Sequence, residues 1–277
     1  MSAWPPGSYS TRCCVDVDLL NPGFGAAAIA GVLGLIFGSF LNVCIVRWGA
    51  EPKQSVVRPR SRCPRCGSEL RPYDNIPVLS WLVLGGNCRN CREPISALYP
   101  MVELATGLIW GYMAWRHGIT LEALAGAIFF TILLGIAVTD FRAYIIPDEF
   151  TLGGLVIGLL LAAFGGWDGL LHAVIGAAAG FALLYAVGFL GTMLFKKDAM
   201  GGGDIKMMAM VGAFVGWKGT LITVFLGAFL GTLIFVPIQF FNRDKLVPFG
   251  IFLALGAAAT WIAGPSLLAW YTGYVGL

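Results

Sequence analysis

The sequence predicts an all-α polytopic membrane protein with about eight transmembrane helices and one cytoplasmic zinc-binding loop. Hydrophobic residues make up 58% of its 277 residues and charged residues only 12%, whereas soluble domains usually carry about 25% charged residues. Apolar runs recur along the whole chain, and a membrane span needs about 20 such residues. Most Lys and Arg residues fall in alternate connections between these runs, which is typical of a multi-spanning protein.

The apolar segments mark the expected helices in chain order. They cover residues 25–47, 98–115, 121–140, 150–165, 169–195, 204–217, 219–240 and 247–271. The fourth and sixth segments are short, so we expect them to be tilted, re-entrant or sheltered by neighbouring helices. Most glycines inside the spans should lie at helix–helix contacts, where the missing side chain permits close approach. These are Gly153, Gly154, Gly158, Gly176, Gly180, Gly227 and Gly231. No internal repeat is apparent.

The basic residues predict the orientation of the spans. The connection after the first segment holds nine Lys or Arg residues, and every second connection after it is basic as well. Since cytoplasmic loops carry the excess of Lys and Arg, the chain should place both termini outside. We expect an outer-side segment at 1–24, an N-terminal region at 25–115 with a polar loop at 48–97, and a membrane domain at 116–277. The net charge of +3 is too small to indicate nucleic-acid binding.

Two aspartates fall at the cytoplasmic ends of predicted spans. Asp140 closes the third segment, and Asp204 opens the sixth, directly after Gly201, Gly202 and Gly203. An ionisable side chain at this depth is costly and usually faces the bundle interior with a functional partner. Two carboxyls in contact share a proton, so one can act as base on a water and the other as acid toward a carbonyl. The pattern therefore predicts an aspartic protease site, in which the glycines permit φ > 0 and lie against a substrate peptide.

Other interpretations of these acids stay open. Asp204 alone is also typical of a helix N-cap, whereas Asp140 lies at a helix C-terminus, where the helix dipole disfavours an anion. Asp148 follows Pro147 and fits a helix start, so we interpret it as structural first. Paired acids also occur in proton-coupled transporters, which would show inverted repeats and acids near the bilayer midplane. In a non-enzymatic assembly scaffold both acids would be dispensable.

Four of the seven cysteines form two C-x-x-C pairs within the polar loop. Cys63 with Cys66 and Cys88 with Cys91 can close a tetrahedral zinc site. Because four protein ligands leave no position for water, this zinc would be structural, and it would stabilise a loop too polar to form its own core. A pair of redox motifs is the alternative interpretation.

Several stretches together resemble the bacterial type IV prepilin peptidases, which are GxGD-type membrane aspartic proteases also called prepilin leader peptidase/N-methyltransferases. In chain order, the resemblance rests on GSFLNVCIVR at 38–47, the two cysteine pairs flanking RPYDNIPVLSW at 71–81, ISALYPMVE at 95–103, Asp140 with IPD at 146–148, and GGGD at 201–204.

The resemblance implies an enzyme of the bacterial inner membrane with its active site at the cytoplasmic face. Its partners would be type IV prepilins and type II secretion pseudopilins, whose basic leader it would remove after a glycine, together with membrane lipid. It would then methylate the new N-terminal residue with S-adenosylmethionine, an activity that the family links to its N-terminal half and loop. By motif match, Asp140 and Asp204 would be the catalytic pair.

A peptidase without the methyltransferase activity remains an alternative. No glycine-rich nucleotide-binding motif marks a site for S-adenosylmethionine. Glu103 and Asp74 are candidates for holding the substrate's new ammonium group, and each is equally compatible with an ordinary acid at the membrane interface.

Overall fold

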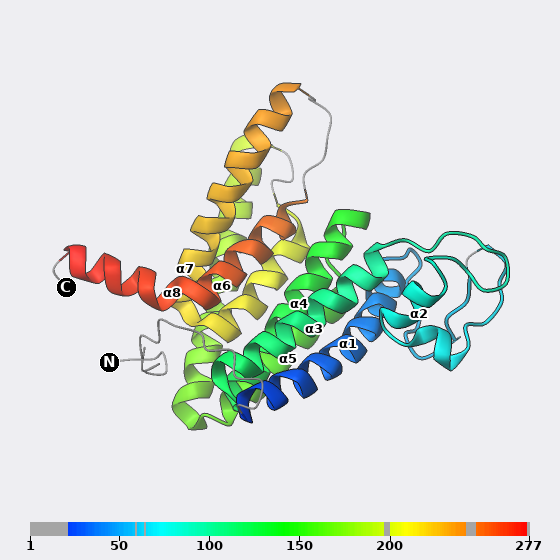
Figure 1. Ribbon diagram of the computed structural model, residues 1–277. Helices are drawn as coiled ribbons and strands as arrows, with labels where there is room; N and C mark the ends of the chain where they lie inside the picture. The colour runs from blue at the N-terminus through cyan, green and yellow to red at the C-terminus, as the bar shows by residue number, and fades with distance from the viewer. Residues whose placement is uncertain (1–21, 59, 64, 197–199, 242–247, 276–277) are drawn as a thin grey trace. The chain divides into compact units, whose positions relative to one another are not determined.

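The computed structural model describes residues 22–58, 60–63, 65–196, 200–241 and 248–275. This part of the chain is helical (Figure 1). In order it forms α1 (Pro22–Trp48), the short 3₁₀ helix η1 (Pro72–Asn75), α2 (Leu79–Val83), α3 (Leu98–His117), α4 (Leu121–Ala143), α5 (Asp148–Ala163), α6 (Gly166–Phe195), α7 (Gly202–Phe241) and α8 (Phe249–Val275). Strand pairing among the described residues is limited to two isolated bridges, so the prediction of an all-α protein is confirmed.

Five of the described helices are long and apolar enough to cross a membrane, namely α1, α4, α6, α7 and α8. The predicted second and fourth spans correspond to α3 and α5, which are not among these five. The predicted sixth and seventh spans both lie in α7, where Gly216 interrupts the helical backbone with φ 69° and ψ 176°. This conformation is essentially restricted to glycine. The protein is therefore a multi-pass membrane protein, but a count of eight spans is not confirmed.

The chain divides into two compact units whose boundary lies between Thr139 and Asp140, near the end of α4. In the first unit, α3 runs antiparallel to α1 at close range. A Cβ atom on Gly34 would lie 2.7 Å from the Thr106 carbonyl oxygen, and one on Gly38 would lie 2.7 Å from the Glu103 Cα. This close packing needs small residues, and it pairs α3 with a membrane-spanning helix over most of its length.

The second unit is built around α7, which packs against α5, α6 and α8. A Cβ on Gly180 would lie 2.1 Å from the Met208 carbonyl oxygen, so α6 and α7 touch through their backbones. Across the interface with α8, Thr223 donates a 3.0 Å hydrogen bond to Thr260. The packing role expected of the span glycines is confirmed at five positions, namely Gly158, Gly176, Gly180, Gly227 and Gly231. Gly153 is an exception, because no neighbouring atom lies within 4 Å of an added Cβ.

Candidate active site and cysteine centre

Asp140 lies three residues before the end of α4 and is 5% exposed. Its Oδ2 accepts a hydrogen bond from the backbone N–H of Ile251, at 3.2 Å, in the first turn of α8. The first N–H groups of a helix have no partner inside the helix, and the helix dipole favours an anion there. The start of α8 therefore compensates for the unfavourable position of this acid at the end of α4.

Asp204 is the third residue of α7 and is 9% exposed. Its Oδ2 lies beside Gly201, where an added Cβ would come within 3.1 Å of it. Its Oδ1 is buried and has no hydrogen-bond partner among the described residues. A helix-start role thus accounts for one carboxylate oxygen and leaves the other without a partner. Unpaired buried polar atoms are rare in folded proteins and need an explanation such as a bound water or a catalytic role.

Ile146 connects the surroundings of the two acids. An added Cβ on Gly203, next to Asp204, would lie 2.9 Å from the Ile146 Cβ. An added Cβ on Gly250 would lie 2.7 Å from the Ile146 Cδ1 and 2.8 Å from the Asp140 Oδ2. Ile146 thus lies beside the residue that precedes Asp204 and beside the glycine that contacts the Asp140 carboxylate. The second unit therefore brings the two acids into one neighbourhood, where the ends of three helices meet.

The expected backbone role of the three glycines is wrong in one respect. None of Gly201, Gly202 and Gly203 has a positive φ, because α7 already begins at Gly202. These glycines instead allow neighbouring side chains to approach the backbone, and only some of the three positions show such a contact. Gly203 lies against Ile146, while Gly202 has no neighbour within 4 Å of an added Cβ.

Sequence reasoning missed Gly250 and Ile251, which hold Asp140. The signal for them is Pro248 directly before Phe249, since proline is typical of a helix start and a helix start supplies free N–H groups. Asp148, the first residue of α5, accepts hydrogen bonds from Lys206 Nζ at 2.8 and 2.9 Å. This ion pair joins α5 to the beginning of α7 and agrees with a structural interpretation of Asp148.

The four predicted zinc ligands gather in space within the first unit. The sulfur atoms of Cys63, Cys66, Cys88 and Cys91 all lie within 4.8 Å of one another. The Sγ atoms of Cys63 and Cys91 are 3.7 Å apart, and tetrahedral zinc with Zn–S bonds of 2.3 Å separates its sulfur ligands by about 3.8 Å. The cluster therefore fits a zinc ion.

Hydrogen bonding favours the thiolate form of two of these cysteines. The hydroxyl of Ser68, 3.0 Å from the sulfur, lowers the pKa of Cys66 to about 6. Backbone N–H groups of Cys91 and Asn90 lower the pKa of Cys88. The thiolate is the form that binds metal, so these contacts favour a cation at Cys66 and Cys88. Against the hydrogen bond of the Glu93 backbone, burial and the neighbouring thiols raise the pKa of Cys91 to about 12.

The two cysteine pairs lie in matching turns that are 25 residues apart, so the expectation of no internal repeat is wrong for this loop. The first turn is closed by the bridge between Arg62 and Glu69, and the second by the bridge between Asn87 and Pro94. The N–H of Cys63 donates to Ser68, and the N–H of Cys88 donates to Glu93 in the same way. The positive φ of 68° at Gly67 recurs as 60° at Arg92. The repeat is not apparent from the sequence because residues 62–69 and 87–94 share few identical residues besides the cysteines.

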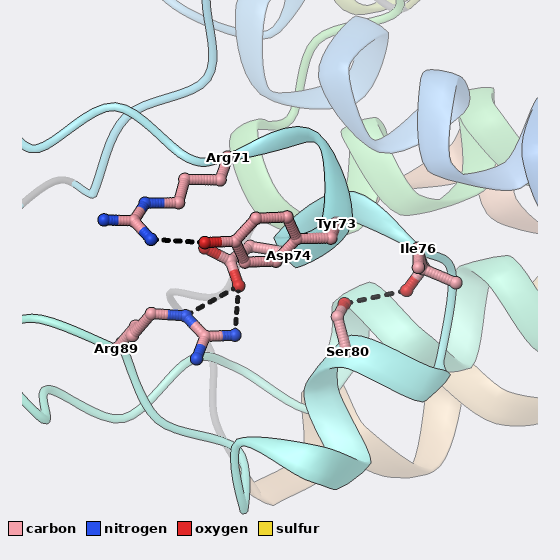
Figure 2. A network of polar contacts seen from close by, with 6 residues as sticks. All are labelled: Arg71, Tyr73, Asp74, Ile76, Ser80 and Arg89. Carbon is pink, nitrogen blue, oxygen red and sulfur yellow. Dashed lines mark hydrogen bonds and ion pairs between the residues drawn. The ribbon is translucent and has the colours of Figure 1, made fainter.

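Both acids proposed for the substrate's ammonium group already have internal partners. Arg89 donates to the Asp74 Oδ1 from Nε at 2.9 Å and from Nη2 at 2.6 Å (Figure 2), and these bonds hold the pKa of Asp74 below its usual value. Glu103 is 9% exposed, and its Oε2 accepts the N–H of Val78 at 2.7 Å. Val78 has φ 61°, which a β-branched residue rarely adopts. These contacts favour the interpretation of both acids as structural.

Comparisons with known proteins agree with the two halves of the chain. Residues 32–117 match the family described as the Bacterial Peptidase A24 N-terminal domain, and residues 127–236 match the Type IV leader peptidase family. Among curated proteins named prepilin leader peptidase/N-methyltransferase, that of Pseudomonas aeruginosa is 38% identical over 84% of this chain and 87% of its own length. That of Myxococcus xanthus is 43% identical over 75% of this chain and 59% of its own length.

A third relative with the same name, from Stutzerimonas stutzeri, is 35% identical over 89% of this chain and 93% of its own length. No solved structure gives a significant match. With matches to both family descriptions and relatives of this similarity along most of its length, the chain belongs to the type IV leader peptidase family.

Proposed function

We propose that this protein is a membrane aspartic endopeptidase that removes the leader peptide of type IV prepilins and then N-methylates the terminus that cleavage exposes. The observation that carries the peptidase assignment is the buried, unpartnered Oδ1 of Asp204 in the neighbourhood of the Asp140 carboxylate. Family membership and the names of the relatives support the same activity. Pseudopilins of type II secretion are substrates of the same chemistry.

In hydrolysis, one of the two acids acts as a general base and the other as a general acid. The carboxylate takes a proton from a water molecule, whose oxygen forms a bond to the scissile carbonyl carbon, while the protonated acid donates its proton to the carbonyl oxygen. The tetrahedral intermediate then loses the amine, which accepts a proton as the C–N bond breaks. Asp140, fixed by the N–H of Ile251, suits the role of the carboxylate. Asp204, with one free oxygen, suits the role of the acid.

The position of these acids suits a substrate that crosses the membrane interface. They lie at the end of α4 and at the start of α7, not in the middle of either helix. A prepilin that keeps its basic leader in the cytoplasm and its apolar helix in the bilayer presents the scissile bond at this depth. We place the site at the cytoplasmic face of the inner membrane, with both termini outside, because the connection after the first predicted span and every second connection after it together carry most of the Lys and Arg residues.

Methylation and the cysteine centre belong to the first unit in this proposal. S-Adenosylmethionine would be the methyl donor. The amine that cleavage exposes would take the methyl group, with S-adenosylhomocysteine and a proton as the other products. Cys63, Cys66, Cys88 and Cys91 hold one zinc ion, which stabilises the loop and takes no part in the chemistry because it has no open coordination position.

Mass spectrometry of a prepilin tests this function. The purified enzyme is incubated with the prepilin and S-adenosylmethionine, and the product is expected to lose its leader and gain one methyl group at its new N-terminus. Asp140→Asn and Asp204→Asn should each abolish cleavage while the protein still accumulates in the membrane.

Asp168→Asn is the matched control, since Asp168 is an exposed acid of the first turn of α6 in the same unit. It should cleave as the unmodified enzyme does. Substantial cleavage by either Asp140→Asn or Asp204→Asn would refute the aspartic mechanism. A cleaved product without a methyl group would favour the alternative of a peptidase that lacks methyltransferase activity.

A further inference from the structure

The segment 76–83 of the polar loop carries an exposed apolar patch, which consists of Ile76, Leu79, Leu82 and Val83. Their side chains are 46%, 60%, 59% and 82% exposed, respectively. They lie on and beside α2, a single helical turn. Loops between membrane spans are usually polar, so four large exposed apolar side chains within eight residues indicate a surface that is covered in the native environment.

The patch is held in a fixed orientation by the residues beneath it. Trp81 points into the loop, where its Nε1 donates to the Ile95 carbonyl oxygen at 3.0 Å, and its ring lies 2.9 Å from an added Cβ on Gly86. Ser80 donates to the Ile76 carbonyl at 2.7 Å (Figure 2). The segment thus directs its half-buried tryptophan into the loop and turns its aliphatic side chains outward.

The attachment of this segment to α3 fixes its depth. The N–H of Val78 donates to Glu103, and Glu103 lies against Gly38 of α1. Gly38 precedes the end of α1 at Trp48 by ten residues, which corresponds to about 15 Å along the helix axis.

The length of α1 relates this depth to the bilayer. The spanning stretch of α1 has 26 residues, so it is about 39 Å long, whereas the hydrocarbon core is about 30 Å thick. About 5 Å of the helix therefore extends beyond the core at each end, which places Gly38 and Glu103 about 10 Å inside the edge of the hydrocarbon. A glutamate side chain reaches about 5 Å back toward the start of its helix, so the Val78 amide lies about 5 Å inside that edge.

Two arginines flank Tyr73, three residues before the first residue of the patch. The guanidinium groups of Arg71 and Arg89 lie 5.8 and 5.3 Å from the centre of the Tyr73 ring, which precedes Ile76 by three residues (Figure 2). Arg89 is also held by Asp74, and Arg71 donates to the Tyr73 hydroxyl. Arginine is the preferred side chain for phosphate groups, and a cationic, amphipathic segment of this kind is typical of a membrane surface.

We propose that the segment 76–83 is an interfacial membrane element that binds the phospholipid surface of the leaflet at the loop side. Leu79, Leu82 and Val83 insert among the acyl chains, and Arg71 with Arg89 contacts headgroup phosphates. The lipid surface is favoured over a protein partner because the depth of Val78 and the adjacent cationic groups both fit it. The bilayer thereby holds the segment beside α3, in addition to the bond between Val78 and Glu103.

Photolabelling with a phospholipid that carries a diazirine in its acyl chain tests this proposal. The full-length protein is reconstituted in nanodiscs that contain the probe, irradiated and digested, and adducts are mapped by mass spectrometry. Adducts on Leu79, Leu82 or Val83 are expected at a yield within a fewfold of that on Leu104 and Leu108, exposed apolar residues of α3. Val57, which is 79% exposed in the same loop, is the internal control and should carry few adducts.

Two variants and one lipid change separate specific insertion from incidental labelling. Leu82→Asp should reduce the adducts on the segment severalfold, whereas Val57→Asp should leave them unchanged. Replacing zwitterionic lipid with phosphatidylglycerol should raise the yield, and Arg71→Gln should remove that increase. Unlabelled 76–83 peptides beside labelled α3, labelling of Val57 equal to that of Leu82, or crosslinks from the segment to a second copy of the chain would each overturn the proposal.

Discussion

At the scale of single residues, the candidate active site depends on which atoms have partners and which do not. The Asp140 Oδ2 is held by the Ile251 N–H, and the Asp204 Oδ2 lies beside Gly201. The Asp204 Oδ1 is buried without a partner. An unpaired buried oxygen costs free energy that the fold must supply elsewhere, and such costs concentrate at functional sites.

The glycines before Asp204 offer a matched pair of substitutions. An added Cβ on Gly203 would lie 2.9 Å from the Ile146 Cβ, whereas one on Gly202 meets nothing within 4 Å. Gly203→Ala should therefore displace Ile146 or the start of α7, and displacements of about 1 Å at an active site can cost about a hundredfold in rate. Gly202→Ala should keep nearly full activity. The measurement is the initial rate of prepilin cleavage by equal amounts of membrane-inserted protein.

The control in this experiment also tests the role of the glycines in substrate binding. If Gly202→Ala slowed cleavage as much as Gly203→Ala, packing against Ile146 would not explain the requirement. The free space beside Gly202 would then have to be occupied by substrate, as the sequence suggested for all three glycines.

At the scale of elements, contacts between glycine backbones hold the second unit together. Helices in a membrane gain little from hydrophobic burial against one another, so close packing carries more of the association free energy. The approach of Gly180 in α6 to the Met208 carbonyl of α7 is among the tightest contacts in this bundle, with 2.1 Å from an added Cβ to the oxygen. It positions the turn of α7 that follows Asp204.

Gly180→Ala should destabilise this packing, and Gly153→Ala should not. Overpacking a tight contact costs about 1–3 kcal/mol of unfolding free energy, whereas Gly153 has nothing within 4 Å of an added Cβ and alanine gains about 1 kcal/mol in helix propensity. Thermal unfolding of the purified protein in one detergent is the measurement. Equal unfolding temperatures for the two variants would contradict the importance of this backbone contact.

The paired turns of the loop form the second element with a clear physical role. Each presents two sulfur atoms, and the polar loop has few apolar residues with which to form a core of its own. We expect about one zinc ion per chain, because one tetrahedral ion takes all four ligands. Metal analysis of the purified protein should show this, and Cys88→Ser should lose the metal.

Cys44→Ser is the appropriate control for the zinc measurement, because Cys44 is a buried free cysteine of α1 outside the cluster. It should retain the metal content of the unmodified protein. A metal-free protein that is folded and active would exclude a structural zinc, and the alternative of two redox-active pairs would then be favoured.

At the scale of the whole molecule, the sequence predicted the helices well because hydrophobic length and glycine spacing are local properties. It also predicted Asp140 and Asp204 as the candidate acids, since a charged residue is easily recognised at the end of an apolar segment. It did not predict that Gly250 and Ile251 would hold Asp140, because this contact joins residues 111 positions apart. Nor did it predict the matching turns, which share backbone hydrogen bonds more than residue identities, or the partners of Asp74 and Glu103.

The division of the chain into two units predicts that its two activities can be separated. Asp140 and Asp204 belong to the unit that begins at Asp140, and the four clustered cysteines belong to the unit that ends at Thr139. Cys88→Ser should therefore release a cleaved product that lacks most of its methyl groups. Conversely, Asp204→Asn should still methylate a synthetic peptide that already carries the mature N-terminus, because this substrate needs no cleavage.

Both halves of this prediction use the same mass-spectrometric assay, with the unmodified enzyme and Cys44→Ser as references for folding and expression. Suppose that both variants have the same unfolding temperature as the unmodified enzyme. If Asp204→Asn then failed to methylate the mature peptide and Cys88→Ser failed to cleave the prepilin, the two reactions would share one site. Loss of methylation in Cys88→Ser with retained cleavage would instead assign the methyl transfer to the first unit. Its acceptor amine would then have to move there from the aspartates after cleavage.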